Sequence, residues 1–346
     1  AGAFANTAKD IGSIDATVNL ILSLLPQSLI LPGLFFATCF ISLSVGTSVG
    51  TIVALVPIAA GLATSMHASL PLVTAVVVGG AFFGDNLSFI SDTTIAATNS
   101  QNCKMSDKFK VNIYIALPAA LIVLAIYSFI GFNLHSQPVA QQIDIVKVLP
   151  YLAVLVTAMM GINVFTVLVT GVALAFVIGL FDGNHDVFSL FHSMGDGVLS
   201  MSELIIITML AGGLFGLVRH DGGIDYIISK ISKRVKGKRG AELVICSLVA
   251  AVDVCTANNT VAIITVGGIA QKISKVYDVD NRRVASLLDT SSCVMQGIIP
   301  YGAQMLMASG LARLNPLDII PYLYYPFILL IFVLGSIMFR FPKKYS

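Results

Sequence analysis

Residues 84–94 read Gly-Asp-Asn-Leu-Ser-Phe-Ile-Ser-Asp-Thr-Thr, and they interrupt an apolar stretch that extends from Leu70 to Thr98. Two carboxylates at the depth of a membrane helix are costly unless they have a function there. Unwound backbone is tolerated in a bilayer only where protein or a water-filled cavity satisfies its polar groups. The stretch therefore predicts a broken transmembrane helix with a polar site at the break.

The composition places the rest of the chain in a membrane. Hydrophobic residues make up 56% of the 346 residues, charged residues make up 11%, and the mean hydropathy is +0.90. A soluble domain carries about 25% charged residues, which this chain lacks. We therefore expect an all-α, polytopic membrane protein that contacts the lipid bilayer.

Apolar stretches of about 20 residues are long enough to span a membrane. Three are uninterrupted, namely Val111–Phe132, Ser200–Val218 and Leu317–Phe339. The stretch 148–181 is long for a single span, and residues 161–163 could divide it into two short ones. Four others contain polar clusters, at residues 35–66, 70–98, 241–273 and 284–311.

Lys and Arg gather in short loops, which marks the cytoplasmic side of a membrane protein. The segment Asp182–Asp196 carries three Asp and no Lys or Arg, so we expect it outside. The basic run 230–239 lies between apolar spans and indicates topology, not nucleic-acid binding. The basic groups are Lys104/Lys108/Lys110, Lys230/Lys233/Arg234/Lys236/Lys238/Arg239, Lys272/Lys275/Arg282/Arg283 and Arg340/Lys343/Lys344.

These loop charges predict two re-entrant hairpins. Residues 241–273 have basic loops at both ends and so enter and leave on the cytoplasmic side, whereas 284–311 cross outward. Residues 70–98 end at a basic loop and cross inward, so 35–66 start and end outside. Each half is then a hairpin followed by a broken span, in opposite orientations.

Similar residues recur 209 to 210 positions apart, as in Val45-x-Thr47-x-x-x-Thr51 and Val254-x-Thr256-x-x-x-Thr260. Inverted repeats with sites at broken helices are typical of secondary transporters. We expect a first repeat at 1–110 (hairpin 33–66, broken helix 70–98). The second repeat is expected at 111–346 (scaffold spans 111–218, hairpin 241–273, broken helix 284–311, final span 317–339). Ala1 aligns with Ala211 inside a span, so we expect further helices to precede Ala1.

The candidate site is formed by the hairpin tips 44–51 and 253–260 and by the breaks 84–94 and 289–304. Hydroxyl, amide, carboxylate and freed carbonyl oxygens suit Na⁺ or another hard cation. No Lys or Arg lies within these four segments, which favours a cation, although helix N-termini can bind a carboxylate. The candidate residues are Thr47, Ser48, Thr51, Asp85, Asn86, Ser88, Asp92, Thr93, Asp253, Thr256, Asn258, Asn259, Asp289 and Gln296.

The segment 84–98, followed by Asp107-Lys108-Phe109-Lys110, closely resembles the signature of the NhaC-type Na⁺/H⁺ antiporters. Residues 46–51 and 296–304 resemble the same family. The resemblance implies cation and substrate sites at hairpin tips and unwound helices, and a mobile transport domain that moves against a dimeric scaffold. We expect Na⁺ ligands at Asp85, Asn86, Asp92, Thr256 and Asn258. Family members usually carry additional N-terminal spans.

We therefore expect an antiporter of the bacterial cytoplasmic membrane that exchanges cytoplasmic Na⁺ for external H⁺ by alternating access, as a homodimer. Na⁺ is the transported ion, and no cofactor is expected. The alternative is Na⁺- or H⁺-coupled transport of a small organic acid or amino acid, as in malate–lactate exchange. An enzyme is disfavoured because no His lies in a polar break. A channel is disfavoured because inverted hairpins indicate alternating access.

Overall fold

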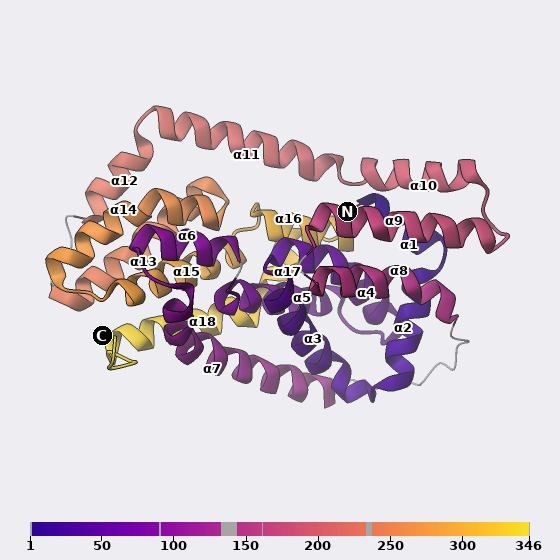
Figure 1. Cartoon of the computed structure of the whole chain (residues 1–346), viewed down its shortest axis with the longest axis horizontal. Coiled ribbons are helices and arrows are strands. Elements are labelled where there is room, and N and C mark those ends of the chain that lie inside the picture. The colour runs from indigo at the N-terminus through magenta and orange to yellow at the C-terminus, as the bar shows by residue number, and fades with distance from the viewer. Residues whose placement is uncertain (1, 90, 133–143, 161, 233–236, 346) are drawn as a thin grey trace.

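The computed structural model describes all residues except 1, 90, 133–143, 161, 233–236 and 346, and the described residues are helical, without a strand (Figure 1). The first half contains α1 (Gly2–Asp10), α2 (Ser13–Leu24), the 3₁₀ turn η1 (Gln27–Leu29), α3 (Ile30–Val45), α4 (Ser48–Ser65), α5 (Leu70–Leu87), α6 (Asp92–Gln101) and α7 (Met105–Phe132). The second contains α8 (Ile145–Met159), α9 (Val164–Phe181), α10 (Val187–Leu199), α11 (Ser202–His220), α12 (Gly223–Ser232), α13 (Gly237–Thr256), α14 (Asn259–Tyr277), α15 (Asn281–Ile298), α16 (Ala303–Ala312), α17 (Pro316–Ile319), η2 (Ile320–Tyr322) and α18 (Tyr324–Met338).

Several helices are long and apolar enough to span a membrane, which confirms an all-α polytopic membrane protein. They are α4, the α5–α6 segment with its break, and α7, and a bent pair adds a fourth span. This pair is Pro316–Tyr322 and Tyr324–Met338, which meet at 54°. The sequence predicted one uninterrupted span over 317–339. Pro321, which has no N–H to continue an α-helix, lies in the 3₁₀ turn that ends the first part.

Of the two interpretations open for residues 148–181, the structure shows two helices, α8 and α9. Asn163 caps α9, because its side chain accepts a hydrogen bond from the backbone N–H of Thr166. An Asn at this position satisfies one of the N–H groups that the first turn of a helix leaves free.

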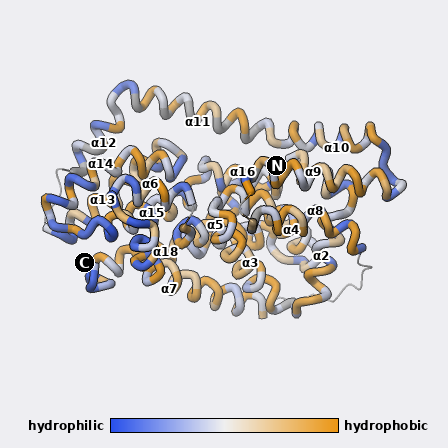
Figure 2. Tube along the Cα trace, in the orientation of Figure 1, coloured by the Kyte–Doolittle hydropathy of each residue, from blue (hydrophilic) through white to orange (hydrophobic). Residues whose placement is uncertain are grey.

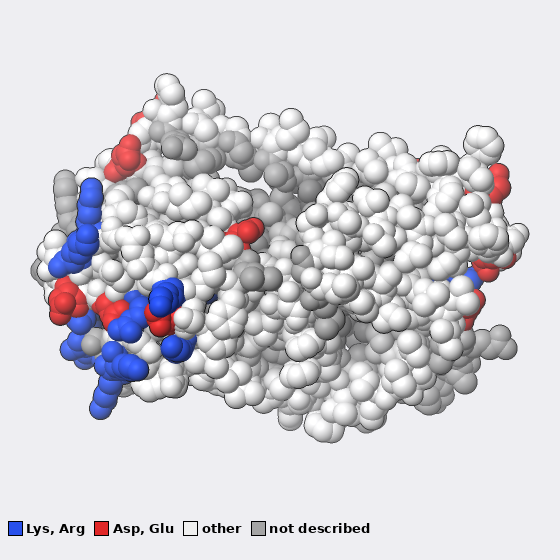
Figure 3. All heavy atoms as spheres, viewed as in Figure 1, with Lys and Arg blue, Asp and Glu red and all other residues white. Residues whose placement is uncertain are grey.

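Basic residues gather at one end of the long axis of the molecule. Hydrophilic residues lie mostly at the two ends and hydrophobic residues between them (Figure 2). On the visible face, Lys and Arg gather at the end formed by α13, α14 and the C-terminus, with acidic residues among them, whereas the charged residues at the opposite end are mostly acidic (Figure 3). Lys108 and Arg283 are exceptions, since both were assigned to basic loops and both are buried. Lys233, Arg234 and Lys236 lie outside the described residues.

The backbone repeats itself more regularly than the sequence suggests. Helices α3–α6 and α13–α16 follow in the same order, and α4, α5 and α6 begin 211 residues before α14, α15 and α16. Backbone with positive φ recurs at the same spacing, in the pairs Gly46/Ala257, His67/Asp278 and Asn102/Arg313. The spacing is therefore 211, not 209 to 210. The spacing estimated from the sequence was wrong by one or two residues. It rested on a few small residues, which also match when the two halves are shifted by one or two positions.

The two halves interlock through their short helices. Helix α6 packs against α14 and α15 of the other half, and α16 packs against α4 and α5. Figure 1 shows α6 among the orange helices α13–α15, and α16 beside α4 and α5. As a result, both hairpin tips and both breaks meet in the middle of the molecule.

Candidate cation-binding site

Four helices begin at one small cavity. Their first residues are Ser48 of α4, Asp92 of α6, Asn259 of α14 and Ala303 of α16. Gly46 adopts a left-handed conformation at the first tip, and Ala257 does so at the second. This conformation reverses the chain within a few residues, so each hairpin presents a helix N-terminus to the cavity. Unpaired N–H groups and the positive end of a helix dipole are located there.

The cavity has a volume of about 110 Å³, which suits an ion with a few water molecules. Sites for drug-sized ligands measure about 300–1,000 Å³. Its lining comes from both halves of the chain and contains Asp85 and Asp92, but no Lys or Arg among the described residues. The lining residues are Gly46, Thr47, Ser48, Val49, Asp85, Asp92, Thr93, Asn258, Asn259, Thr260, Gln296, Ala303 and Gln304.

Asp85 is held between the first break and the first hairpin tip. Its side chain is 4% exposed, and its Oδ1 accepts a hydrogen bond of 3.1 Å from the backbone N–H of Ser48. Helices α3 and α5 approach closely beside it, because Gly84 has no side chain. A Cβ at Gly84 would lie 2.0 Å from the Oγ of Ser42. The Ser42 hydroxyl in turn donates to the carbonyl of Ala81 over 2.7 Å.

A chain of amides joins the second break to the first tip. The Nε2 of Gln296 donates to the backbone carbonyl of Ala257 over 3.0 Å and to the Oε1 of Gln304 over 2.8 Å. The Nε2 of Gln304 then donates to the Oγ of Ser48 over 3.1 Å. Gln296 is buried, and its Oε1 has no hydrogen-bond partner among the described residues. A buried acceptor without a donor is suited to a cation.

The structure brings eight of the predicted site residues to the cavity wall and leaves six outside it. Those at the wall are Thr47, Ser48, Asp85, Asp92, Thr93, Asn258, Asn259 and Gln296, and those outside it are Thr51, Asn86, Ser88, Asp253, Thr256 and Asp289. Asp92 is exposed at the cavity, whereas Asp85 is buried. The expected Na⁺ ligands are thus divided, with Asp85, Asp92 and Asn258 at the wall.

The other two expected ligands turn away because their polar groups bind neighbouring residues. The Oδ1 of Asn86 accepts a hydrogen bond of 3.2 Å from the hydroxyl of Tyr325. The Thr256 hydroxyl donates to the backbone carbonyl of Asn258 over 3.1 Å. Position next to a break predicts that a residue is near the site, but not the direction of its side chain.

A buried ion pair behind the first break was missed by the sequence. The Nζ of Lys108, from the start of α7, lies 2.8 Å from the Oδ2 of Asp289 on α15. Asn112, one turn further along α7, donates to the same oxygen over 2.8 Å. Lys108 was assigned to a cytoplasmic loop. Lys108 and Asn112 are four residues apart at the start of an apolar helix, so their side chains lie on the same face of that helix. This spacing could have indicated in the sequence that Lys108 is part of a buried polar cluster.

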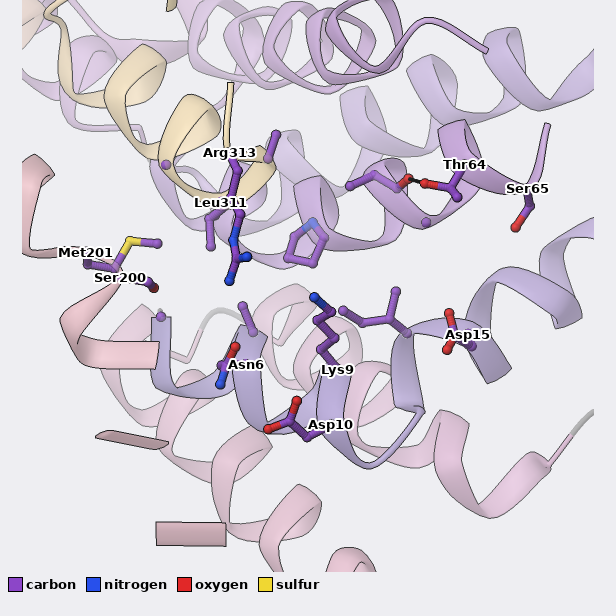
Figure 4. A pocket seen from close by; sticks show the side chains of 18 residues that line it. Asn6, Lys9, Asp10, Asp15, Thr64, Ser65, Ser200, Met201, Leu311 and Arg313 are labelled. Atoms are coloured by element: carbon purple, nitrogen blue, oxygen red, sulfur yellow. Dashed lines mark hydrogen bonds between the residues drawn. The ribbon is translucent and has the colours of Figure 1, made fainter. Parts of the chain in front are cut away.

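A second, larger cavity lies at the far ends of α4 and α16. It has a volume of about 560 Å³ and is lined by parts of α1, α2, α4 and α16, including Asp10 and Asp15. Lys9 and Arg313 point toward each other across it (Figure 4). Because α4 and α16 begin at the small cavity and end at this one, their packed faces connect the two.

Comparison with known proteins shows the family of the chain. A family model described as the Na⁺/H⁺ antiporter family matches residues 1–132 and 139–343. The chain is 25% identical to the Na⁺/H⁺ antiporter NhaC of Bacillus subtilis, over 96% of this chain and 80% of the relative. It is 20% identical to a malate-2H⁺/Na⁺-lactate antiporter of the same organism, over 83% and 68%. It is 21% identical to the arginine/ornithine antiporter ArcD of Halobacterium salinarum, over 91% and 72%.

Proposed function

Because the chain belongs to the Na⁺/H⁺ antiporter family, we propose that it exchanges cytoplasmic Na⁺ for external H⁺ across the bacterial cytoplasmic membrane. One observation carries the proposal: the cavity where both hairpins and both breaks meet contains two carboxylates and no Lys or Arg among its described lining. The relatives named as Na⁺/H⁺ antiporters support the same cargo.

The chemistry is a competition for oxygen atoms. A Na⁺ ion in the cavity would bind the carboxylates of Asp85 and Asp92 and the oxygens of Gln296 or Asn258. A proton on a carboxylate removes the negative charge that attracts Na⁺. An empty cavity with two unpaired carboxylates is costly to carry through the membrane. The protein therefore changes conformation loaded with Na⁺ or with protons, which couples the two fluxes.

Alternating access would expose the cavity to one side at a time. The 560 Å³ cavity lies between the α1–α2 segment and the far ends of α4 and α16, away from the basic end of the molecule. By the loop charges that side faces outward, so this cavity is a candidate for the external half of the path. In the proposed arrangement, a transport domain carrying the hairpins moves against a scaffold that forms a homodimer.

The test is a dye-quench antiport assay in everted membrane vesicles. Asp85→Asn removes the buried charge with little change in shape, and we expect it to abolish Na⁺-dependent proton movement. The matched control is Asp278→Asn, which makes the same change at an exposed position with φ of 53°, where Asn is well tolerated. Wild-type antiport in vesicles containing Asp85→Asn would overturn the proposal.

A second candidate cargo is a small organic acid or amino acid. Four helix N-termini face the cavity, and N–H groups at such termini bind carboxylates. Two relatives are also named for malate–lactate and arginine/ornithine exchange. Uptake of radiolabelled malate, lactate or arginine by proteoliposomes, stimulated by a Na⁺ or proton gradient, would favour this cargo. The volume of about 110 Å³ favours an inorganic ion over an organic molecule.

A further inference from the structure

We propose that Lys108 is a tethered cation that fills a second cation site behind the first break, so that this site takes no transported ion. The role of Lys108 in transport rests on the proposed function. The existence of the second cation site does not depend on the proposed function, because that site is built from residues other than those that line the small cavity.

The ammonium group of Lys108 occupies a position made of oxygen atoms from three helices. Its Nζ donates to the backbone carbonyl of Asn86 over 2.9 Å and to the Thr94 hydroxyl over 2.6 Å. It also pairs with the Asp289 carboxylate at 2.8 Å. A lysine ammonium has three N–H donors, so all of them are used. A carbonyl, a hydroxyl and a carboxylate are also the oxygen types that bind hard cations such as Na⁺.

The surroundings keep this position dry and polar. The side chains of Lys108 and Asp289 are 1% and 0% exposed. Asn112 donates over 2.8 Å both to the carbonyl of Asn86 and to the carboxylate of Asp289. Its own Oδ1 is buried without a hydrogen-bond partner among the described residues. Such a site needs a positive charge, because an unpaired buried carboxylate is strongly destabilising.

A covalently attached charge differs from a dissolved one in a single respect relevant to transport: it cannot leave. Lys108 fills the position permanently and neutralises Asp289, the buried carboxylate of α15. The two carboxylates at the cavity wall, Asp85 and Asp92, remain unneutralised. Lys108 is therefore a positioning residue that holds the break and sets how many Na⁺ ions the chain binds.

The experiment replaces the tethered charge with a neutral side chain and supplies Na⁺ in its place. Purified Lys108→Gln is titrated with NaCl against choline chloride at equal ionic strength, with thermal unfolding and ²²Na⁺ binding as readouts. We expect a melting temperature below wild type in choline and a saturable recovery with Na⁺. The recovery is expected because a ligand that binds only the folded state stabilises it. We also expect about one more ²²Na⁺ bound per chain than in wild type.

Two variants serve as controls. Lys108→Gln combined with Asp289→Asn removes both charges, and we expect it to lose the additional Na⁺ binding and the additional recovery. Lys110→Gln removes a lysine that is 61% exposed two residues along the same helix, and we expect it to behave as wild type. If Lys108→Gln cannot be recovered in Na⁺, Lys108→Ser, which leaves more room for an ion, undergoes the same titration.

The proposal is overturned if Na⁺ restores neither variant beyond the shift seen in wild type, or if the double variant binds as much ²²Na⁺ as Lys108→Gln. The comparison of Lys108→Gln with the double variant does not involve Asp85. It therefore tests the second cation site alone. Normal antiport by Asp85→Asn would overturn the proposed function without deciding whether this second site exists.

Discussion

The first break, between α5 and α6, and the second, between α15 and α16, have the same backbone and opposite chemistry. At positions 211 residues apart, Asp85 corresponds to Gln296 and Asp92 to Ala303. Each break begins one helix at the cavity and each hairpin tip begins another, so the repeat supplies four helix N-termini. Only the first break supplies carboxylates to the cavity wall. The comparison teaches that the repeated backbone forms the cavity, whereas unequal side chains give it a negative charge.

The hairpin tips show the same division. Ser48 and Asn259 occupy corresponding positions as first residues of α4 and α14. The N–H of Ser48 donates to the carboxylate of Asp85, while Asn259 also lines the cavity. The carboxylate of Asp289 has no counterpart in α5, where Val78 stands 211 residues earlier, and Lys108 neutralises it. The charge of Asp289 is thus balanced by Lys108 of the first half, whereas the carboxylates of Asp85 and Asp92 are left for a ligand.

The largest effect is expected from making the two breaks alike. Asp85→Gln gives both breaks an amide, and we expect antiport in vesicles to fall to the background of membranes without the protein. Exchanging the residues, as Asp85→Gln with Gln296→Asp, keeps the cavity charge but moves it to the other wall. We expect this double variant to recover roughly one hundredth to one tenth of the wild-type rate, the range typical of a displaced group. Equal activity of single and double variants would show that the charge of the cavity is not what matters.

A smaller effect is expected on the stability of the second half. Arg283 of α15 pairs with Glu242 of α13 at 3.4 Å, and it also donates to the Ser336 hydroxyl over 2.9 Å. Both charges are buried, so Arg283→Met leaves Glu242 unpaired and should lower the free energy of unfolding by about 3–5 kcal/mol. Thermal or denaturant unfolding in detergent measures this. Adding Glu242→Gln to Arg283→Met should restore much of the lost free energy of unfolding. If it restores none, the unpaired charge of Glu242 is not the cause of the loss.

The smallest effect concerns the close approach of α3 and α5 beside Asp85. Gly84→Ala places a Cβ 2.0 Å from the Ser42 Oγ and should destabilise the protein by about 1–3 kcal/mol through overpacking. The matched control is Gly268→Ala in α14, where nothing lies within 4 Å of the added Cβ. At that position the substitution should raise the free energy of unfolding by up to about 1 kcal/mol, because Ala favours a helix more than Gly does. Equal unfolding temperatures for the two variants would argue against this packing.

The sequence predicted the elements of this fold because polar clusters within apolar runs are conspicuous. The polar clusters predicted the turns between α3 and α4 and between α13 and α14 and the breaks after α5 and α15, and the re-entrant course of the hairpins stays a prediction. Side-chain direction was harder to predict. Asn86 and Asp85 are adjacent, yet only Asp85 reaches the cavity, because Tyr325 of α18 binds the Asn86 side chain. Lys108 was misassigned since a lysine near a helix start usually lies in water, and only tertiary packing reveals its partner Asp289.

The competition of Na⁺ and protons for Asp85 and Asp92 is tested most directly by equilibrium binding. ²²Na⁺ binding to the purified protein is measured across a series of pH values, without any gradient or membrane. We expect the apparent Kd for Na⁺ to rise about tenfold per unit fall in pH over the range in which one proton competes. Asp85→Asn should lose most of this binding. A Kd that does not change with pH in the wild-type protein would contradict a shared site.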